Sequence, residues 1–271
     1  MGRFYSKTNG FFSVIKWEWL FRFLQQMGEL SFFTYQFFHH LFQKPFEGQE
    51  VIRQSTAIGL STLPIVSLTG FIMGLVLTLQ TRPVLVAFGA ESWTPSMVAI
   101  SIVREIGPII TALICAGKIG SGIGAELGAM RVTEQIDAME VSGTHPMKYL
   151  VVTRVLAVTL VLPILVFYAD AIALFGSYLA INLHSEIAPS LFIAQVFEEL
   201  YFFDLLPATL KTLAFGFAIG IIGCFKGYYT TNGTEGVGRA ANAAVVMASL
   251  AIFILDLMAV KLHDLFHLWN Y

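Results

Sequence analysis

Four charged residues interrupt long apolar runs of this chain: Arg104, Glu105, Lys211 and Asp256. A charged group inside a membrane-spanning helix is costly unless it is paired or faces water, so each of the four is a functional candidate. Their charges sum to zero. The planar fork of Arg104 suits bidentate binding of a phosphate. The set therefore predicts a polar patch, in a cavity open to one side of the membrane, that can receive a group carrying a phosphate.

A second interpretation of these charges is purely structural. Lys211 and Asp256 lie near the outer ends of their apolar runs. Their side chains would extend along the helix until the charged group reaches the membrane surface. Arg104 and Glu105 would instead form ion pairs with other helices, because neighbours on a helix point about 100° apart. Both interpretations stay open. Asp170 is expected near the outer surface and is left out of the set.

The composition indicates what kind of protein carries these charges. The chain has 271 residues, of which 56% are hydrophobic and 13% are charged, and its mean hydropathy is +0.72. Soluble domains are about one quarter charged, so a soluble or disordered chain is excluded. Cys115 and Cys224 both lie in apolar runs, which argues against a disulfide framework or a zinc site. The net charge of −2 gives no sign of nucleic-acid binding.

Five apolar runs are long enough to cross a bilayer, which needs about 20 residues per helix. They cover residues 54–81, 94–116, 149–181, 205–225 and 240–260. The third run is longer than one crossing needs, so it should tilt or extend past the bilayer. The prediction is an all-α, polytopic membrane protein with a single transmembrane domain over 51–271.

Residues 1–50 form a separate N-terminal segment that is rich in aromatic side chains. The start does not read as a cleavable signal peptide. Polar residues recur at helical spacing in an apolar body, which predicts an amphipathic helix lying in the headgroup plane. These residues are Glu18, Arg22, Gln25, Glu29, Gln36, His40 and Gln43. A buried amphipathic helix of a soluble domain is the alternative.

The lysines and arginines set the orientation, because cytoplasmic segments carry most of them. A cytoplasmic N-terminus places twelve inside: Arg3, Lys7, Lys16, Arg22, Lys44, Arg53, Lys118, Arg131, Lys148, Arg154, Lys226 and Arg239. It leaves only Arg82 and Lys261 outside. With this orientation all four intramembrane charges lie in the outer half of the bilayer.

The segment between the second and third crossings is charged and helical in pattern. Gly120, Gly124 and Gly128 share one face, which allows another helix to approach closely. Charged residues follow in an amphipathic stretch that ends at Gly143, and they are Glu126, Arg131, Glu134, Asp137 and Glu140. A cytoplasmic helix over about 120–143 suits docking on a soluble partner. An ordinary ordered loop is the alternative.

This segment also carries a resemblance. AGKIGSGIGAELGAMRVTEQIDAMEVSGTHPMKYLVVTRVLA resembles the central motif of the MlaE family of permeases, and the match includes the unusual EQIDAMEV block. REIGPIITAL is similar to that family's second helix, and GYYTTNGTEGVGRAANAAVV is similar to its last cytoplasmic loop. Together the resemblance covers about residues 55–260.

The resemblance implies the membrane subunit of an ABC-type lipid transporter in a two-membrane envelope, where lipid asymmetry of the outer membrane is maintained. It implies a homodimer in the inner membrane, a separate cytoplasmic ATPase that binds the ATP, and sometimes a STAS-domain protein. It also implies a periplasmic MCE-domain partner that exchanges phospholipid. The chain itself is then no enzyme and needs no cofactor or metal. In this family the segment after the second helix couples to the ATPase, and that role transfers to Glu126–Val141.

Other functions have weaker support. A secondary transporter or channel for a small solute predicts an internal repeat, and five crossings do not divide into equal halves. An intramembrane enzyme acting on lipids needs catalytic side chains at one depth, and the histidines lie at the ends. A passive assembly subunit does not explain the intramembrane charges.

Overall fold

The computed structural model describes residues 8–43, 47–183, 185–200, 202–231 and 233–269. Within them every element is helical, which confirms the all-α prediction. The chain divides into two compact units, 1–46 and 47–271. The first unit contains one long helix, α1 (Thr8–Leu41). Along it Gln25 donates to Glu29 at 2.9 Å, four residues on. The proposed interfacial position of this helix stays a prediction, and the side chains of Glu18 and Arg22 lie outside the described residues.

Among its described residues the second unit contains five helices long and apolar enough to cross a membrane, which confirms the predicted number of crossings. They cover Gly48–Ala87, Glu91–Val132, Met147–Asn182, Leu205–Tyr228 and Gly233–Leu262. The first is α2 (Gly48–Ala87). The last two belong to α9 (Phe202–Tyr228) and α10 (Gly233–Trp269). The chain is therefore a multi-pass membrane protein.

The second crossing is a chain of short helices rather than one regular helix. It starts with the 3₁₀ turn η1 (Glu91–Trp93) and continues through α3 (Thr94–Ser101), η2 (Ile102–Ile106), α4 (Gly107–Cys115), η3 (Ala116–Gly120) and α5 (Ser121–Val132). Both η2 and η3 are π-turns. The third crossing begins with another π-turn, η4 (Met147–Val152), and continues as α7 (Thr153–Asn182). Single π-turns within α-helices are frequent at functional sites.

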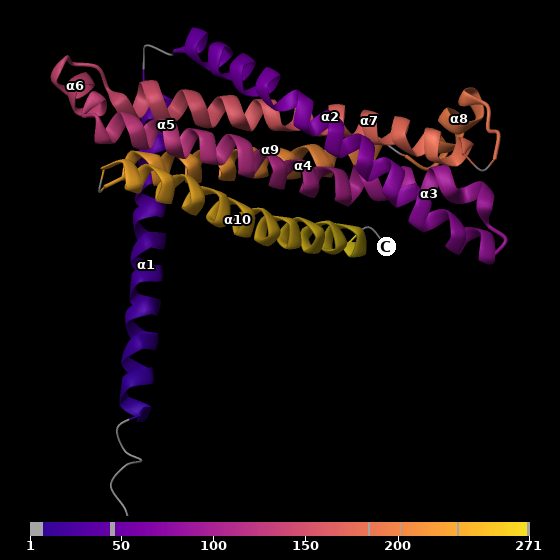
Figure 1. Ribbon diagram of the computed structural model, residues 1–271, viewed down its shortest axis with the longest axis horizontal. Coiled ribbons are helices and arrows are strands. Elements are labelled where there is room, and N and C mark those ends of the chain that lie inside the picture. Colours follow the sequence, from indigo (N-terminus) through magenta and orange to yellow (C-terminus); the bar gives the residue numbers. More distant parts are fainter. Residues whose placement is uncertain (1–7, 44–46, 184, 201, 232, 270–271) are drawn as a thin grey trace, which may run out of the picture. The chain divides into compact units, whose positions relative to one another are not determined.

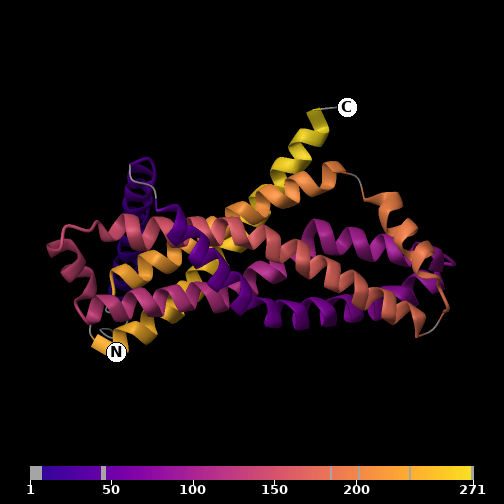
Figure 2. The ribbon, with the colours of Figure 1, turned by 90° about the horizontal axis from the view of Figure 1, so that it is seen from above.

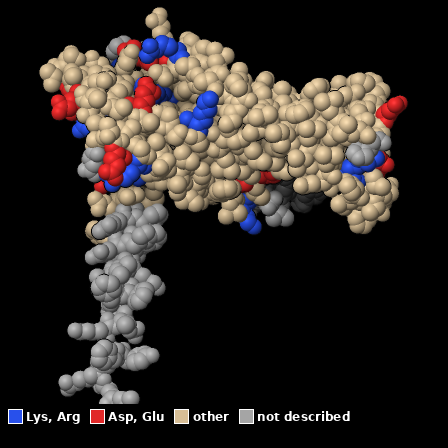
Figure 3. All heavy atoms as spheres, viewed as in Figure 1, with Lys and Arg blue, Asp and Glu red and all other residues tan. Residues whose placement is uncertain are grey.

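Two short helices lie outside this pattern, at opposite ends of the unit (Figure 1, Figure 2). Helix α6 (Gln135–Val141) follows α5 at one end, and α8 (Pro189–Glu199) follows α7 at the other. On the face drawn in Figure 3, charged side chains gather mainly toward the α6 end and a few lie at the α8 end, and uncharged side chains cover most of the surface between them. Such a band is the surface expected of a protein that faces hydrocarbon.

Small residues allow the crossings to pack closely. Helices α2 and α7 run parallel, and a Cβ added to Gly74 would lie 1.8 Å from the backbone oxygen of Ala173. Gly216 and Gly220 of α9 contact α7 in the same way, at Thr159 and Val155. The glycine pair of α2, Gly70 and Gly74, and the pair of α9 therefore both pack helices of one chain together. These pairs do not mark an interface between two copies.

The glycine face predicted after the second crossing is also used inside the chain. A Cβ added to Gly124 would meet Ala241 of α10 at 3.4 Å. A Cβ added to Gly227 of α9 would lie 2.9 Å from the backbone oxygen of Gly124. The second crossing consequently continues to Val132, sixteen residues beyond the expected end at Ala116.

The single helix expected over 120–143 is therefore wrong in its boundaries. The segment forms α5 and α6, separated at Thr133 and Glu134, and Glu134 has a left-handed backbone with φ of 60°. The expected end at Gly143 is confirmed by its φ of 79°. The Gly143 N–H donates to Glu140 and the Thr144 N–H to Met139, both at 3.0 Å. This pair of bonds is the Schellman motif that closes many helices.

Candidate functional site

Three of the four intramembrane charges meet in one ion cluster. Lys211 of α9 donates to Glu105 Oε2 at 2.8 Å and pairs with Asp256 Oδ1 at 2.9 Å. The Lys211 side chain is only 5% exposed, whereas the Glu105 side chain is 46% exposed. Three separate segments, η2, α9 and α10, are joined by one cation. The name "charge cluster" refers below to Glu105, Lys211 and Asp256.

The backbone carbonyl of Arg104 also binds Lys211, and Pro108 explains why this carbonyl is available. Proline has no N–H, so Pro108 cannot bond the carbonyl four residues before it, which belongs to Arg104. The helix widens into the π-turn η2, and the Gly107 N–H bonds Ile102 instead. The released Arg104 carbonyl accepts from Lys211 Nζ at 3.0 Å. Pro108 thus creates the acceptor that positions Lys211.

The guanidinium of Arg104 has a different environment from the charge cluster. Arg104 is an exposed residue, although it lies on the π-turn next to Glu105. Both carboxylates of the charge cluster are already paired with Lys211. The arrangement therefore holds an exposed guanidinium beside a cluster of two acids and one lysine, within an apolar crossing. Such a fork can bind a phosphate through two parallel hydrogen bonds.

The structure separates the two interpretations of these residues. Lys211 does not extend toward the membrane surface, because it is buried and holds two acids. The structural interpretation is thus correct in part for Lys211, Glu105 and Asp256, since they pair with each other. The role of Arg104 as a phosphate ligand stays a prediction.

Asp170 is placed differently from expectation. It was expected near the outer surface, but it lies in the middle of α7 and is only 5% exposed. Its Oδ1 has no hydrogen-bond partner in the described part of the chain. A Cβ added to Gly107 would lie 1.9 Å from this oxygen, so the carboxyl packs against the glycine that ends the π-turn. Asp170 belongs with the intramembrane charges.

Arg154 is a second buried charge, which the sequence analysis counted only among the cytoplasmic cations. It is 4% exposed at the start of α7. Arg154 donates to Glu126 Oε1 at 2.7 Å and to the Leu150 carbonyl at 3.0 Å. Its position five residues inside the expected crossing of 149–181 was the available signal. The pair ties α5 to α7.

The residues predicted to couple to an ATPase have mixed surroundings. Arg131 pairs with Asp137 across the break between α5 and α6. Glu140 accepts from Tyr228 at 3.4 Å. Glu126 binds Arg154. Glu134 alone of the five stands at the break itself, exposed, where its backbone turns the chain.

Comparison with known proteins identifies the family of this chain. The model of the permease MlaE family matches residues 51–262. The chain belongs to the MlaE permease family. A probable ABC transporter permease protein of Rickettsia prowazekii is 37% identical over 241 residues, covering 89% of this chain and 93% of the relative. MlaE permeases of this kind are membrane subunits of ABC transporters and are not themselves catalytic.

Two further relatives have names that refer to a lipid. The intermembrane phospholipid transport system permease protein MlaE of Haemophilus influenzae is 32% identical, covering 76% of this chain and 79% of that protein. The chloroplastic protein TRIGALACTOSYLDIACYLGLYCEROL 1 of Arabidopsis thaliana is also 32% identical, covering 77% of this chain and 59% of that protein. The chain is thus the permease subunit of an ABC transporter, and the MlaE family implies an ATPase partner.

Proposed function

We propose that this permease moves glycerophospholipid between the inner membrane and a periplasmic MCE-domain partner, and so maintains the lipid asymmetry of the outer membrane. The observation that carries the proposal is the exposed Arg104 fork beside the charge cluster. A phosphate at membrane depth needs a cationic partner, and Arg104 supplies an exposed guanidinium whose planar fork suits a phosphate. The printed name of the Haemophilus relative supports the same substrate class.

The orientation follows from the end at which the basic residues lie. Five of them stand at or near the α6 end of the crossings: Arg53, Arg131, Lys148, Lys226 and Arg239. The opposite end carries Arg82, which pairs with Glu91 at 2.6 Å. The α6 end is therefore assigned to the cytoplasm and the α8 end to the periplasm, with the N-terminus inside.

The α6 end is the side on which we place the ATPase. Helix α6 is closed by the Schellman motif, and the Arg131–Asp137 pair connects it to α5. Glu134, directly before the start of α6, presents an exposed negative charge. We assign docking to Glu126, Arg131, Glu134, Asp137 and Glu140, with Glu134 as the residue that is free to meet a basic partner surface.

The assembly is proposed as a homodimer, because each chain offers one such docking element and ABC ATPases act in pairs. A STAS-domain protein is a further expected partner on the cytoplasmic side. ATP would be bound by the ATPase and not by this chain. Native mass spectrometry of the permease–ATPase complex should find two copies of this chain, and one copy would contradict the assembly.

The test of the function is a transfer assay with the complete transporter in proteoliposomes. A fluorescent phospholipid should move to or from a soluble MCE-domain acceptor only when ATP and the ATPase are present. Transfer that is driven by an ion gradient without the ATPase would support the alternative, a secondary transporter or channel. Absence of any lipid movement with an active ATPase would contradict the proposal.

A further inference from the structure

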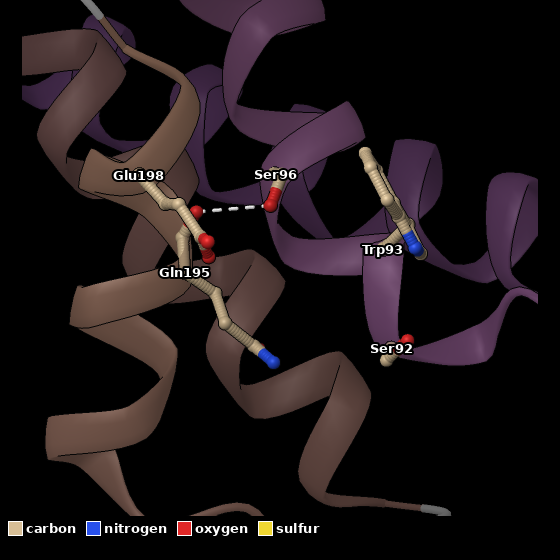
Figure 4. Close-up of a pocket in the computed structure, with 5 residues that line it drawn as sticks. All are labelled: Ser92, Trp93, Ser96, Gln195 and Glu198. Carbon is tan, nitrogen blue, oxygen red and sulfur yellow. Dashed lines mark hydrogen bonds between the residues drawn. The ribbon is translucent and has the colours of Figure 1, made fainter.

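A polar hollow of about 200 Å³ lies between the start of the second crossing and helix α8 (Figure 4). Five residues line it: Ser92, Trp93, Ser96, Gln195 and Glu198. Trp93 and Ser92 stand on one side, and Gln195 and Glu198 on the other. The Ser96 hydroxyl donates to the Gln195 backbone carbonyl at 2.9 Å and fastens the two walls together.

The lining offers hydrogen-bond acceptors and negative charge. None of the five residues is basic. The side-chain oxygen of Gln195 is buried and has no hydrogen-bond partner in the described part of the chain. Because the Ser96 hydroxyl already donates its hydrogen bond to the Gln195 carbonyl, it can only accept a hydrogen bond from a group in the hollow. An unsatisfied buried acceptor costs free energy until a donor reaches it.

These features fit a cation that donates several hydrogen bonds. A primary ammonium carries three N–H donors, and Glu198 would supply the opposite charge. The Trp93 ring can add a cation–π contact. A phosphate does not fit, because it would meet a carboxylate and no base. A divalent metal does not fit either, since no group of three His, Cys, Asp or Glu side chains occurs among the described residues.

The location relates the hollow to the intramembrane site. Ser96 and Arg104 lie on the same crossing, about 12 Å apart at 1.5 Å per residue. With the orientation proposed above, the hollow lies at the level of the outer headgroups, where tryptophan is enriched. We propose that this hollow is a binding site for a primary ammonium group, such as that of an ethanolamine-type phospholipid headgroup. As a lipid site it rests on the proposed function.

The test uses Trp93 as its own reporter, in the otherwise full chain carrying Trp17→Phe, Trp19→Phe and Trp269→Phe. The fluorescence of Trp93 in nanodiscs is titrated with dihexanoyl-phosphatidylethanolamine and with the phosphatidylglycerol of equal chain length. Only the ammonium-bearing lipid should change the signal saturably. Glu198→Gln should weaken its binding about tenfold or more, because a charge-assisted bond becomes a neutral one.

Glu186→Gln is the matched control, since Glu186 lies in the same segment between α7 and α9 but does not line the hollow. It should bind the ethanolamine lipid as tightly as the parent chain. Equal responses to both lipids, or equal affinities in the Glu198→Gln and Glu186→Gln variants, would overturn the site.

A further titration with free ethanolamine identifies the source of the ammonium. Weaker binding than the short-chain lipid supports a lipid headgroup, whereas equal binding supports a small free amine at the same site. The result is separable from the proposed function. A chain that transports no phospholipid would still bind ethanolamine through Glu198, and a wrong site would leave Trp93 silent while ATP-dependent lipid transfer continues.

Discussion

The charge cluster and the α5–α6 segment use charged side chains in opposite ways. In the charge cluster one buried lysine holds two acids from two other segments, so each charge depends on groups far away in the sequence. In the α5–α6 segment Arg131 and Asp137 are six residues apart and both remain partly exposed. Exposed pairs contribute little to stability, whereas breaking a buried pair is strongly destabilising. Stability and function should thus be coupled in the first region and separable in the second.

The largest effect is expected at Lys211. Lys211→Met leaves Glu105 and Asp256 without their common cation and removes the donor to the Arg104 carbonyl. Removing one partner of a buried pair costs about 3–5 kcal/mol, so the thermal unfolding temperature in detergent should fall sharply. Lys261→Met, which removes an exposed lysine of α10, is the control and should leave it unchanged. Equal unfolding temperatures for the two variants would refute the charge cluster as a structural element.

A smaller loss is expected when the π-turn is crowded. Gly107→Ala would place a methyl group 1.9 Å from Asp170 Oδ1 and 2.8 Å from the Ile102 carbonyl. Overpacking of this kind costs about 1–3 kcal/mol. Gly117→Ala lies on the same crossing, and nothing is within 4 Å of the added methyl group. It should be neutral or slightly stabilising in the same unfolding assay, and an equal loss in both variants would show that crowding at Asp170 is not the cause.

The Glu126–Arg154 pair lies between the two extremes, because its arginine is buried and its glutamate is half exposed. Glu126→Gln keeps a hydrogen-bond acceptor, and the Leu150 carbonyl remains a second partner for Arg154. We expect a loss of about 1 kcal/mol, well below that of Lys211→Met, because water can reach the site. Chemical or thermal unfolding of both variants in one detergent tests this order, and a reversed order contradicts the comparison.

The smallest effect on stability is expected at the exposed break between α5 and α6. Glu134→Lys breaks no side-chain hydrogen bond or ion pair recorded among the described residues, so unfolding should stay the same. Binding of the ATPase should weaken, because a reversed charge at a complementary surface is repelled. Asp137→Lys is a less clean probe, since it would also place a second cation beside Arg131. Unchanged co-purification of the ATPase with Glu134→Lys would remove Glu134 from the docking surface.

The crossings could be predicted because the length of an apolar run is read directly from the sequence and needs no knowledge of the packing. The sequence also indicated the end at Gly143, since glycine is the residue that adopts a left-handed backbone without strain. The break at Glu134 was missed for the same reason, because a glutamate there carries no such sign. The three π-turns were missed as well, although Pro108 marks the carbonyl that one of them releases.

The site was predictable as a set of residues but not as a geometry. Charges in apolar runs identified Arg104, Glu105, Lys211 and Asp256. Their pairing depends on how η2, α9 and α10 pack, and no local pattern contains that information. The burial of Arg154 and Asp170 was not predicted, because burial is decided by the neighbouring helices and not by the position of a residue in its own run.

The central claim is that Arg104 binds the phosphate of a phospholipid while the charge cluster maintains the fold around it. The most direct measurement is the amount of phospholipid recovered with the purified permease–ATPase complex, compared between the parent chain, Arg104→Ala and Arg104→Lys. Arg104→Ala should lower the unfolding temperature much less than Lys211→Met, because Arg104 is exposed and Lys211 still pairs with both acids. Its bound phospholipid should fall about tenfold or more through loss of a charge-assisted contact. Arg104→Lys should restore it only in part, because an ammonium lacks the planar fork. A stable Arg104→Ala complex with a normal phospholipid load would contradict the claim.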